Sequence, residues 1–196
     1  MDIKPITLTG QMVRLEPLSE AHVPGLTMAG QYESIWKYML YGMVTNQEKM
    51  RQWVMDRLER QAKGTDLPFV VVHLESGNII GSTRYMEIVP KYRRVEIGGT
   101  WFTPAFQRTA ANSESKYLLL RHAFETWDCI RVQFKTDQRN MRSQLALERI
   151  GAVKEGVFRN HMITPEGNIR NSVYYSIVDS EWPEVKTRLE EMLNPR

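Results

Sequence analysis

The chain has 196 residues, of which 42% are hydrophobic and 25% are charged, a composition typical of a soluble globular protein. No Pro-, Gly- or Ser-rich linker divides it, so we expect one domain over residues 1–196. The formal net charge is +3 and the basic residues are scattered among acidic ones, which argues against a nucleic-acid-binding face. The start, MDIKPITLTG, lacks a signal-peptide pattern and no apolar run could span a membrane. A cytoplasmic protein without membrane contact is expected.

Cysteine and histidine are too sparse to indicate a metal site. Cys129 is the only cysteine, which excludes an intrachain disulfide and a cysteine-based metal cluster. It lies between a predicted helix and a predicted strand, where a small buried hydrophobe is commoner than a nucleophile. None of the four histidines has the close pairing of a zinc-binding helix, so we predict no metal.

The first half of the chain predicts two helices and four strands, and its hydrophobic periodicity changes with each element. The helices are residues 19–30, begun by Ser19, and a longer helix from a Thr45 cap to about Lys63. The strands are 12–16, 68–74, 79–88 and 93–102, and the last three form an antiparallel meander.

The second half alternates helices with strands. It predicts helices at 113–127 and 140–150 and one starting near Ser180, with strands at 131–136, 152–158 and 169–177. Strands separated by helices of this length indicate a parallel crossover added to the meander. The expected fold is therefore α+β, a mixed and mostly antiparallel sheet of about seven strands with helices on both faces.

A polar turn leads directly into an amphipathic helix at FQRTAANSESKYLLLRHAFE, residues 106–125. We expect Asn112 or Ser113 to cap this helix, whose first backbone N–H groups could then bind an anion such as a pyrophosphate. The turn has no glycine, but the small side chains of Ala110 and Ala111 permit close approach if no positive φ is needed. The alternative is an ordinary helix start without a ligand.

Two charged side chains bear on that choice. Arg108 offers a guanidinium to a phosphate, whereas Glu114 in the first helical turn would repel an anion. Glu114 should therefore point away from the turn if the turn binds an anion.

A second strand-to-helix joint lies at DQRNMRS, residues 137–143. Asn140 is a good helix cap and Ser143 follows one turn later. Either the pair is only a cap with a solvated serine, or it lines a ligand site, because parallel strands place ligands at their carboxyl ends.

The strand RRVEIGGTWF carries a glutamate, Glu96, just before a pair of glycines. Glu96 could be a general base, or it could be a surface residue paired with Arg93 or Arg94. Gly98 and Gly99 inside a strand indicate a bulge or the close approach of a ligand.

Aromatic and methionine side chains are concentrated between residues 32 and 43. Such a cluster is more often core than binding site. As a working hypothesis we assign Trp36, Tyr38 and Tyr41, together with Arg84, to the pocket for a second substrate.

Taken together, these segments resemble the GNAT superfamily of acyl-CoA-dependent N-acetyltransferases, in particular its RimJ/RimL-like branch. The resemblance runs from about residue 10 to residue 193. It rests on GQMVRLEPLSEAHV, EIGGTWF, NSESKYLLLRHAFE, RVQFKTDQRNMRSQLALERIGAVKEGVFR and NSVYYSIVDSEWPEVKTRL.

The resemblance implies a GNAT-like fold in which one parallel strand pair splays apart to admit acetyl-CoA. The family signature, Gln or Arg, two residues, Gly, one residue, then Gly or Ala, reads QRTAAN here. The implied cofactor contacts are Gln107, Arg108, Thr109, Ala110, Ala111, Asn112 and Ser113 from this turn, Trp101, Phe102 and Thr103 from the strand before it, and Asn140.

The resemblance also implies catalytic roles. Ser143 matches the serine assigned in this branch as the acid for the departing thiolate. Pro104 and Ala105 stand where some relatives carry a glutamate base, so Glu96 or a chain of waters becomes the candidate base.

The implied activity is transfer of an acetyl group from acetyl-CoA to a primary amine, such as a protein N-terminus, without a metal. Two alternatives stay open: a non-catalytic acyl-CoA-binding module, which the missing glycines and the missing glutamate base suggest, and an acetyltransferase for drugs or polyamines. Assembly as a homodimer also stays open.

Overall fold

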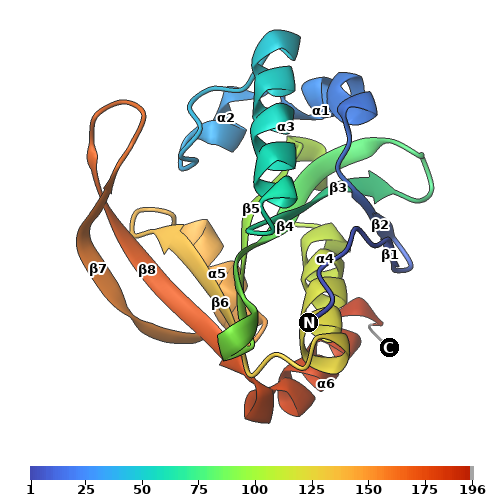
Figure 1. The fold of residues 1–196 in the computed structure, drawn as a ribbon, viewed down its shortest axis with the longest axis vertical. Coiled ribbons are helices and arrows are strands. Elements are labelled where there is room, and N and C mark those ends of the chain that lie inside the picture. Colours follow the sequence, from blue (N-terminus) through green and yellow to red (C-terminus); the bar gives the residue numbers. More distant parts are fainter. Residues whose placement is uncertain (195–196) are drawn as a thin grey trace.

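The computed structural model describes residues 1–194 and shows one eight-stranded mixed sheet with helices on both faces (Figure 1). The strand order is β1-β2-β3-β4-β5-β6-β8-β7, and within residues 1–194 only the β5–β6 pair is parallel. The strands are β1 Leu8–Thr9, β2 Val13–Pro17, β3 Leu67–His73, β4 Ile79–Val89, β5 Arg94–Phe102, β6 Arg131–Asp137, β7 Val153–Ile163 and β8 Ile169–Val178. This confirms the predicted fold, with the short β1 as the additional strand.

The helices form two layers, one on each face of the sheet. They are α1 Val23–Gly30, α2 Glu33–Trp36, α3 Gln47–Ala62, α4 Ala110–Arg121, α5 Met141–Arg149 and α6 Trp182–Leu193. Helices α1, α2 and α3 share one apolar core, to which they contribute Leu26, Trp36 and Val54. Helices α4, α5 and α6 contribute Leu118, Leu147 and Leu189 to the other. The sheet therefore separates two cores, and its central strands are covered on both faces.

Strand β3 contributes side chains to both cores. Phe69 and Val71 belong to the core beneath α4, α5 and α6, which we call the α4 core. Val70 and Val72 belong to the core beneath α1, α2 and α3, which we call the α3 core. Because successive side chains point to opposite faces, an uninterrupted apolar run suits a strand buried on both sides.

The parallel pair is short, and its strands then diverge. β5 and β6 pair only from Arg94↔Arg131 to Glu96↔Gln133. Beyond this point β5 continues to Phe102 and β6 to Asp137 without pairing to each other. The two carboxyl ends therefore leave a wedge between them, which confirms the expected splayed pair.

A β-bulge lies on β5 where the strands separate. The β4–β5 register passes from Arg84↔Gly98 to Ser82↔Trp101, so β5 has one more residue than β4 here. Gly99 adopts φ +58°, a value that favours glycine. The prediction of a bulge from the paired glycines is confirmed.

Several predicted helix starts need correction. Helix α3 is capped by Asn46, whose side chain accepts a hydrogen bond from Lys49 N at 3.0 Å, and not by Thr45. Ser19 begins a 3-10 turn, Glu20–His22, and α1 follows it. Cap-forming residues stand next to one another in these segments, so the sequence pattern alone does not select the cap.

Other boundaries differ in length. The predicted helix 113–127 is α4 followed by a π-helical turn, His122–Thr126, and the predicted strand 152–158 extends to Ile163. Gly151 follows α5 with φ +96°, as expected of a C-terminal cap. No helix among residues 1–194 is long and apolar enough to cross a membrane.

Candidate active site

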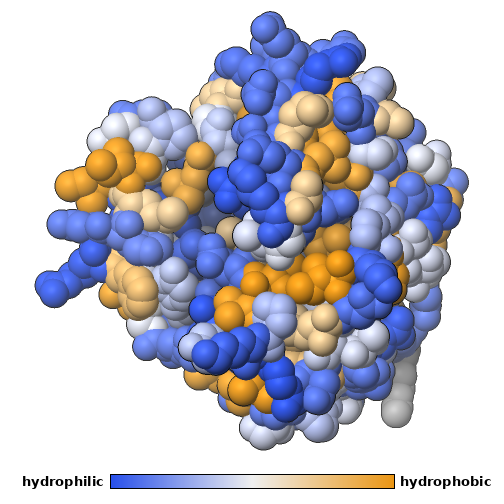
Figure 2. Space-filling view, viewed as in Figure 1, coloured by the Kyte–Doolittle hydropathy of each residue, from blue (hydrophilic) through white to orange (hydrophobic). Residues whose placement is uncertain are grey.

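The candidate site is the wedge between the carboxyl ends of β5 and β6, where α4 and α5 begin. In Figure 2 the surface is hollowed between the β7–β8 hairpin and the layer that contains α2 and α3. This agrees with the position of the wedge in Figure 1. Both strand-to-helix joints identified in the sequence therefore open on the same part of the molecule.

The turn before α4 adopts a conformation that does not require glycine at residue 110 or 112. Thr109, and neither Asn112 nor Ser113, caps the helix: its Oγ1 accepts from Ala111 N at 3.3 Å. The left-handed residue of the turn is Arg108, with φ +65°. Because Ala110 and Asn112 already lie in α4, neither needs a positive φ and neither position requires glycine.

Hydrogen bonds to β5 and to α5 hold this turn in place. Gln107 Nε2 donates to Phe102 O at 2.9 Å, and its Oε1 accepts from Arg142 Nη1 in α5. Arg149 Nη2 in turn donates to Ser113 Oγ at 3.4 Å. The starts of α4 and α5 are therefore connected directly, and two α5 guanidinium groups lie beside the turn and the first turn of α4.

Glu114 points away from the turn, as predicted for an anion site. Its carboxylate accepts from the backbone N–H groups of Gln11, Met12 and Val13 at 2.7–2.8 Å. The side chain is 4% exposed and its charge is directed to the start of β2. An anion at the start of α4 would not meet this carboxylate.

The joint before α5 is a capped helix start, as predicted. Asn140 Oδ1 accepts from Ser143 N at 3.1 Å. The Ser143 side chain is half-buried, and its hydroxyl makes no hydrogen bond to another residue of the described part of the chain. Ser143 Oγ is therefore available to a ligand in the wedge.

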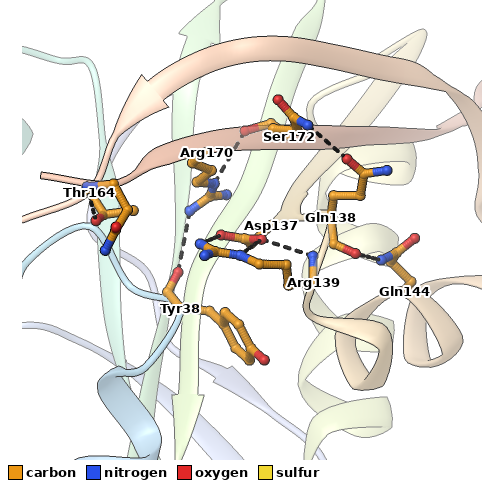
Figure 3. A network of polar contacts seen from close by, with 10 residues as sticks. Tyr38, Asp137, Gln138, Arg139, Gln144, Thr164, Arg170 and Ser172 are labelled. Carbon is orange, nitrogen blue, oxygen red and sulfur yellow. Dashed lines mark hydrogen bonds and ion pairs between the residues drawn. The ribbon is translucent and has the colours of Figure 1, made fainter. Parts of the chain in front are cut away.

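Asp137, at the end of β6, organises this joint (Figure 3). It accepts from Arg139 N at 2.8 Å and from Arg139 Nη2 at 2.7 Å. Burial alone would raise the pKa of Asp137, but the Arg139 hydrogen bonds and charge outweigh burial and lower it. Asp137 is a fixed carboxylate, so it holds the α5 start in place.

Glu96 is buried in the wedge, at the last residue of the parallel pairing. It is 2% exposed and accepts from Gln133 Nε2 at 2.9 Å, while Lys135 Nζ lies 3.6 Å from its Oε1. The alternative of a surface glutamate paired with Arg93 or Arg94 is therefore wrong. Its partners instead come from β6, because side chains of adjacent strands meet across the pairing.

A row of side chains that the sequence pattern did not reveal continues from Glu96 across β6, β8 and β7. Lys135 Nζ lies 5.8 Å from the Tyr174 ring centroid, and His161 packs edge-on against Tyr174 at 5.8 Å. Burial, and then the charge of Lys135, lower the pKa of His161, so its imidazole is neutral at pH 7. His161 Nδ1 is buried and has no hydrogen-bond partner within residues 1–194. The imidazole is a second candidate base beside Glu96.

The aromatic segment before α3 divides between core and site. Trp36 is 2% exposed, and its Nε1 donates to Gly30 O at 2.8 Å, which places it in the α3 core. Tyr41 is half-buried, and its hydroxyl accepts from Arg84 Nη2 at 3.4 Å. The Tyr38 carbonyl accepts from Arg170 Nη1 at 3.3 Å, which joins this segment to β8 (Figure 3).

Lys116 is the least expected residue of the site. It lies on α4 and is 6% exposed, and its Nζ donates to Thr100 Oγ1 in β5 at 2.9 Å. Nζ also lies 5.9 Å from the ring centroid of Phe134 in β6. Burial lowers the pKa of Lys116 to about 7. This ammonium therefore lies at the α4 side of the wedge, in contact with both diverging strands.

One known protein family matches most of this chain. Residues 13–153 match the family described as "Acetyltransferase (GNAT) domain". None of the curated proteins matches the chain.

Solved structures agree along the whole chain. A T. thermophilus protein assigned as an acetyltransferase is 36% identical, with 99% of this chain and 100% of that chain covered and a TM-score of 0.89. A GCN5-related N-acetyltransferase from Brucella melitensis is 28% identical, with 98% and 87% covered and a TM-score of 0.92. Mycobacterium smegmatis RimJ in complex with CoA-disulfide is 18% identical, with 97% and 96% covered and a TM-score of 0.82, and shares the fold. The chain belongs to the GNAT acetyltransferase family.

Proposed function

We propose that the protein transfers an acetyl group from acetyl-CoA to a primary amine, with the wedge between β5 and β6 as the donor site. The family uses acetyl-CoA. The observation that carries the proposal for this chain is the divergence of the parallel pair β5–β6 after Glu96↔Gln133, on the side where both strands lead into helices. Ligands of open sheets bind at such carboxyl ends.

The residues around the wedge fit the chemical parts of acetyl-CoA. The N–H groups at the start of α4 and the nearby guanidinium groups of Arg108, Arg142 and Arg149 suit a pyrophosphate. The backbone of β5 beyond Glu96 has no strand partner on the β6 side, so the backbone of Trp101, Phe102 and Thr103 can bond the amide-containing arm. Asn140 then holds the α5 start against the donor.

The donor supplies an activated acetyl thioester, and the chain supplies proton transfer and orientation. The incoming amine must lose a proton, for which Glu96 and the neutral His161 are the candidate acceptors. Ser143 Oγ carries a proton without a protein hydrogen-bond acceptor, so it can donate that proton when the sulfur leaves. Backbone N–H groups of β5 near the bulge can stabilise negative charge that develops on the acetyl oxygen.

Amine basicity favours an α-amine acceptor. An α-amine has a pKa of ~8, so roughly a tenth is neutral at pH 7, whereas a lysine with a pKa of ~10.4 is neutral at about one part in a few thousand. An enzyme without a strong base should acetylate an α-amine more readily than a lysine side chain. We therefore propose a protein or peptide N-terminus, or an amino compound of similar basicity, within the RimJ/RimL-like branch.

The structure weakens the support for the two alternative functions. A non-catalytic module was suggested by the missing glycines and by the missing glutamate base. The left-handed position of the turn is Arg108, so glycine is not required at 110 or 112, and Glu96 and His161 are candidate bases in place of that glutamate. A polyamine acceptor would favour an acidic pocket, yet the buried guanidinium groups of Arg57 and Arg84 lie 4.5 Å and 5.8 Å from the Tyr41 ring centroid.

The test is an assay of CoA release and of acetylated product with acetyl-CoA and three acceptors: a peptide with a free N-terminus, an N-blocked lysine peptide and spermidine. We expect the free N-terminus to be the best acceptor. Ser143→Ala should lower kcat by about 100-fold, and Ser180→Ala, at an exposed serine outside the wedge, should not change it. Melting-temperature shifts by acetyl-CoA without CoA release would support the non-catalytic module. The absence of both would overturn both functions.

A further inference from the structure

The α3 side of the wedge contains more buried positive charge than the protein neutralises. Arg57 on α3 and Arg84 on β4 are 5% and 6% exposed. Arg170 on β8 is 5% exposed and bonds the Tyr38 carbonyl and Ser172 Oγ. Its charge is balanced by the buried Asp137 carboxylate, so the surplus lies with Arg57 and Arg84. Buried charges are normally paired with an opposite charge, because removing an ion from water is costly.

Arg57 has no such partner among residues 1–194. Its guanidinium stacks on the rings of Tyr41 and Trp53, with Cζ 4.5 Å and 5.5 Å from their centroids. No carboxylate lies within ion-pair distance of it, and its Nε makes no hydrogen bond. Burial and then the charge of Arg84 lower the pKa of Arg57 to about 10, so it is still charged at pH 7.

Arg84 uses only part of its hydrogen-bonding capacity. Arg84 Nη1 lies 2.9 Å from Asp66 Oδ2, but neither atom has hydrogen-bond geometry, and Arg84 Nε is also without a partner. We regard the pair as a charge contact that is poorly aligned. Asp66 therefore neutralises one of two neighbouring guanidinium groups, and the pair Arg57 and Arg84 keeps a net positive charge.

These groups lie next to the point where β5 and β6 separate. A Cβ atom added at Gly99 would be 2.8 Å from Tyr41 Oη and 3.1 Å from Arg84 Nε. Gly99 is the bulge residue of β5, so Tyr41 and Arg84 lie directly on the bulge, and Arg57 stacks on Tyr41. The unpaired charge is adjacent to the wedge in which we place the donor.

Among the buried polar groups without partners here, Gln61 Oε1 and Asp66 Oδ2 are acceptors, but donors outnumber them. Trp53 Nε1 and Trp101 Nε1 are buried without a hydrogen-bond acceptor within the described residues. Both rings pack together, with centroids 6.3 Å apart. A site with surplus N–H donors and surplus positive charge is suited to an anion, and a planar carboxylate matches the fork of a guanidinium.

We propose that the amine acceptor carries a carboxylate, which binds Arg57 and Arg84 beside Tyr41. This proposal rests on the acetyl transfer proposed above and names the class of acceptor. A free amino acid and a peptide with an acidic side chain near its N-terminus both present this chemistry. Polyamines and amines without an acidic group lack it.

The first experiment compares acceptors on the unaltered enzyme. Peptides that begin Ser-Glu and Ser-Gln, both amidated at the C-terminus, differ only in the side-chain carboxylate. Alanine and alaninamide test the α-carboxylate, with rates expressed per neutral amine because their amine pKa values differ. We expect kcat/KM to be at least about tenfold higher for the carboxylate member of one pair. Equal values in both pairs would overturn the proposal and leave the acetyl transfer standing.

The second experiment measures binding without turnover. N-acetylglycine, which carries a carboxylate but no amine, should bind the wild type in calorimetry, and N-acetylglycinamide should bind at least about tenfold more weakly. Arg57→Gln should remove this difference, and Arg57→Lys should restore part of it, since the charge returns without the fork. Arg60→Gln is the matched control, because Arg60 is an exposed arginine on the same helix.

The two experiments separate the two proposals. Arg57-dependent binding of N-acetylglycine with no acetylation of any amine would support the anion site and count against the proposed transfer. Acetylation with no carboxylate preference and no effect of Arg57→Gln would support the proposed transfer and count against the anion site. If Arg57→Gln fails to fold, the acceptor comparison on the wild type still decides.

Discussion

Lys116 places an ionisable group where the protein has little to stabilise its charge. Its ammonium donates to a hydroxyl, Thr100 Oγ1, and meets no carboxylate among residues 1–194. Burial lowers its pKa to about 7, whereas an unfolded lysine titrates near ~10.4. Between these pH values the unfolded chain binds a proton that the folded chain has lost. The free energy of unfolding should therefore rise with pH across this window, and the contribution of Lys116 should be constant below it.

We expect Lys116→Met to remove this rise. The variant should be more stable than the wild type at pH 7, by up to about 4 kcal/mol, and the difference should shrink toward pH 10.5. Urea unfolding of both proteins at pH 7, 8.5 and 10 measures this, and titrations shared by both, such as that of Cys129, cancel in the comparison. Parallel stability curves would show that Lys116 is not the group responsible.

Single residues were the hardest features to predict from the sequence. The helical periodicity of α4 identified the side chains that face the core, but it could not show that Lys116 extends between two strands. Periodicity places Arg57 on or near the apolar face of its helix with Trp53 and Val54, but it does not show that the buried guanidinium lacks a carboxylate partner among the described residues. Burial of a charge depends on neighbours distant in the chain, and no local pattern records them.

At the scale of elements, Glu114 joins α4 to the first long strand of the sheet. Its carboxylate accepts three backbone N–H groups at residues 11–13. Gly10 permits this approach, since a Cβ there would be 2.4 Å from the Glu114 carboxyl carbon. The negative charge that would have weakened an anion site at the start of α4 instead fixes α4 to β2.

Glu114→Gln should destabilise the protein by about 3 kcal/mol, because an amide cannot accept for all three donors and adds an N–H group beside them. Arg108→Gln, in the exposed turn before α4, should change stability by less than about 0.5 kcal/mol. Chemical denaturation compares the two variants. A loss below about 1 kcal/mol in Glu114→Gln would mean that water replaces the carboxylate at these N–H groups.

Elements were predicted more accurately than their ends. The two amphipathic helices around the wedge and the strands of the meander follow from periodicity, and Asn140 was predicted correctly as the cap of α5. The predicted cap of α4 was wrong by three or four residues, because the left-handed Arg108 lets Thr109 start the helix earlier. Tertiary contacts at Gln107, which local propensity does not describe, hold that turn.

At the scale of the molecule, the sheet consists of two parts that share few backbone contacts. Strands β1–β5 and β6–β8 are joined by the three register pairs between Arg94↔Arg131 and Glu96↔Gln133 and by the core beneath α4. The crossover pattern predicted this parallel pair, and the family resemblance added the splay. How far the strands diverge depends on the Gly99 bulge and on side chains such as Lys116 between them.

Acetyl-CoA bound in the wedge would contact both parts, so it should protect the wedge from hydrogen exchange. Saturation at 100 times Kd stabilises the whole protein by about 2.7 kcal/mol, which slows exchange at every amide that opens only by global unfolding. Short labelling times instead report local opening. In that window we expect slower exchange at residues 98–102 and 108–113. We expect no change in exchange at residues 179–181, which follow β8 at the opposite end of the sheet, where Arg131 pairs with Val178. Mass spectrometry of peptides with and without acetyl-CoA measures this. Protection at 179–181 alone would place the donor outside the wedge, whereas protection of both strand-to-helix joints would identify them as one site.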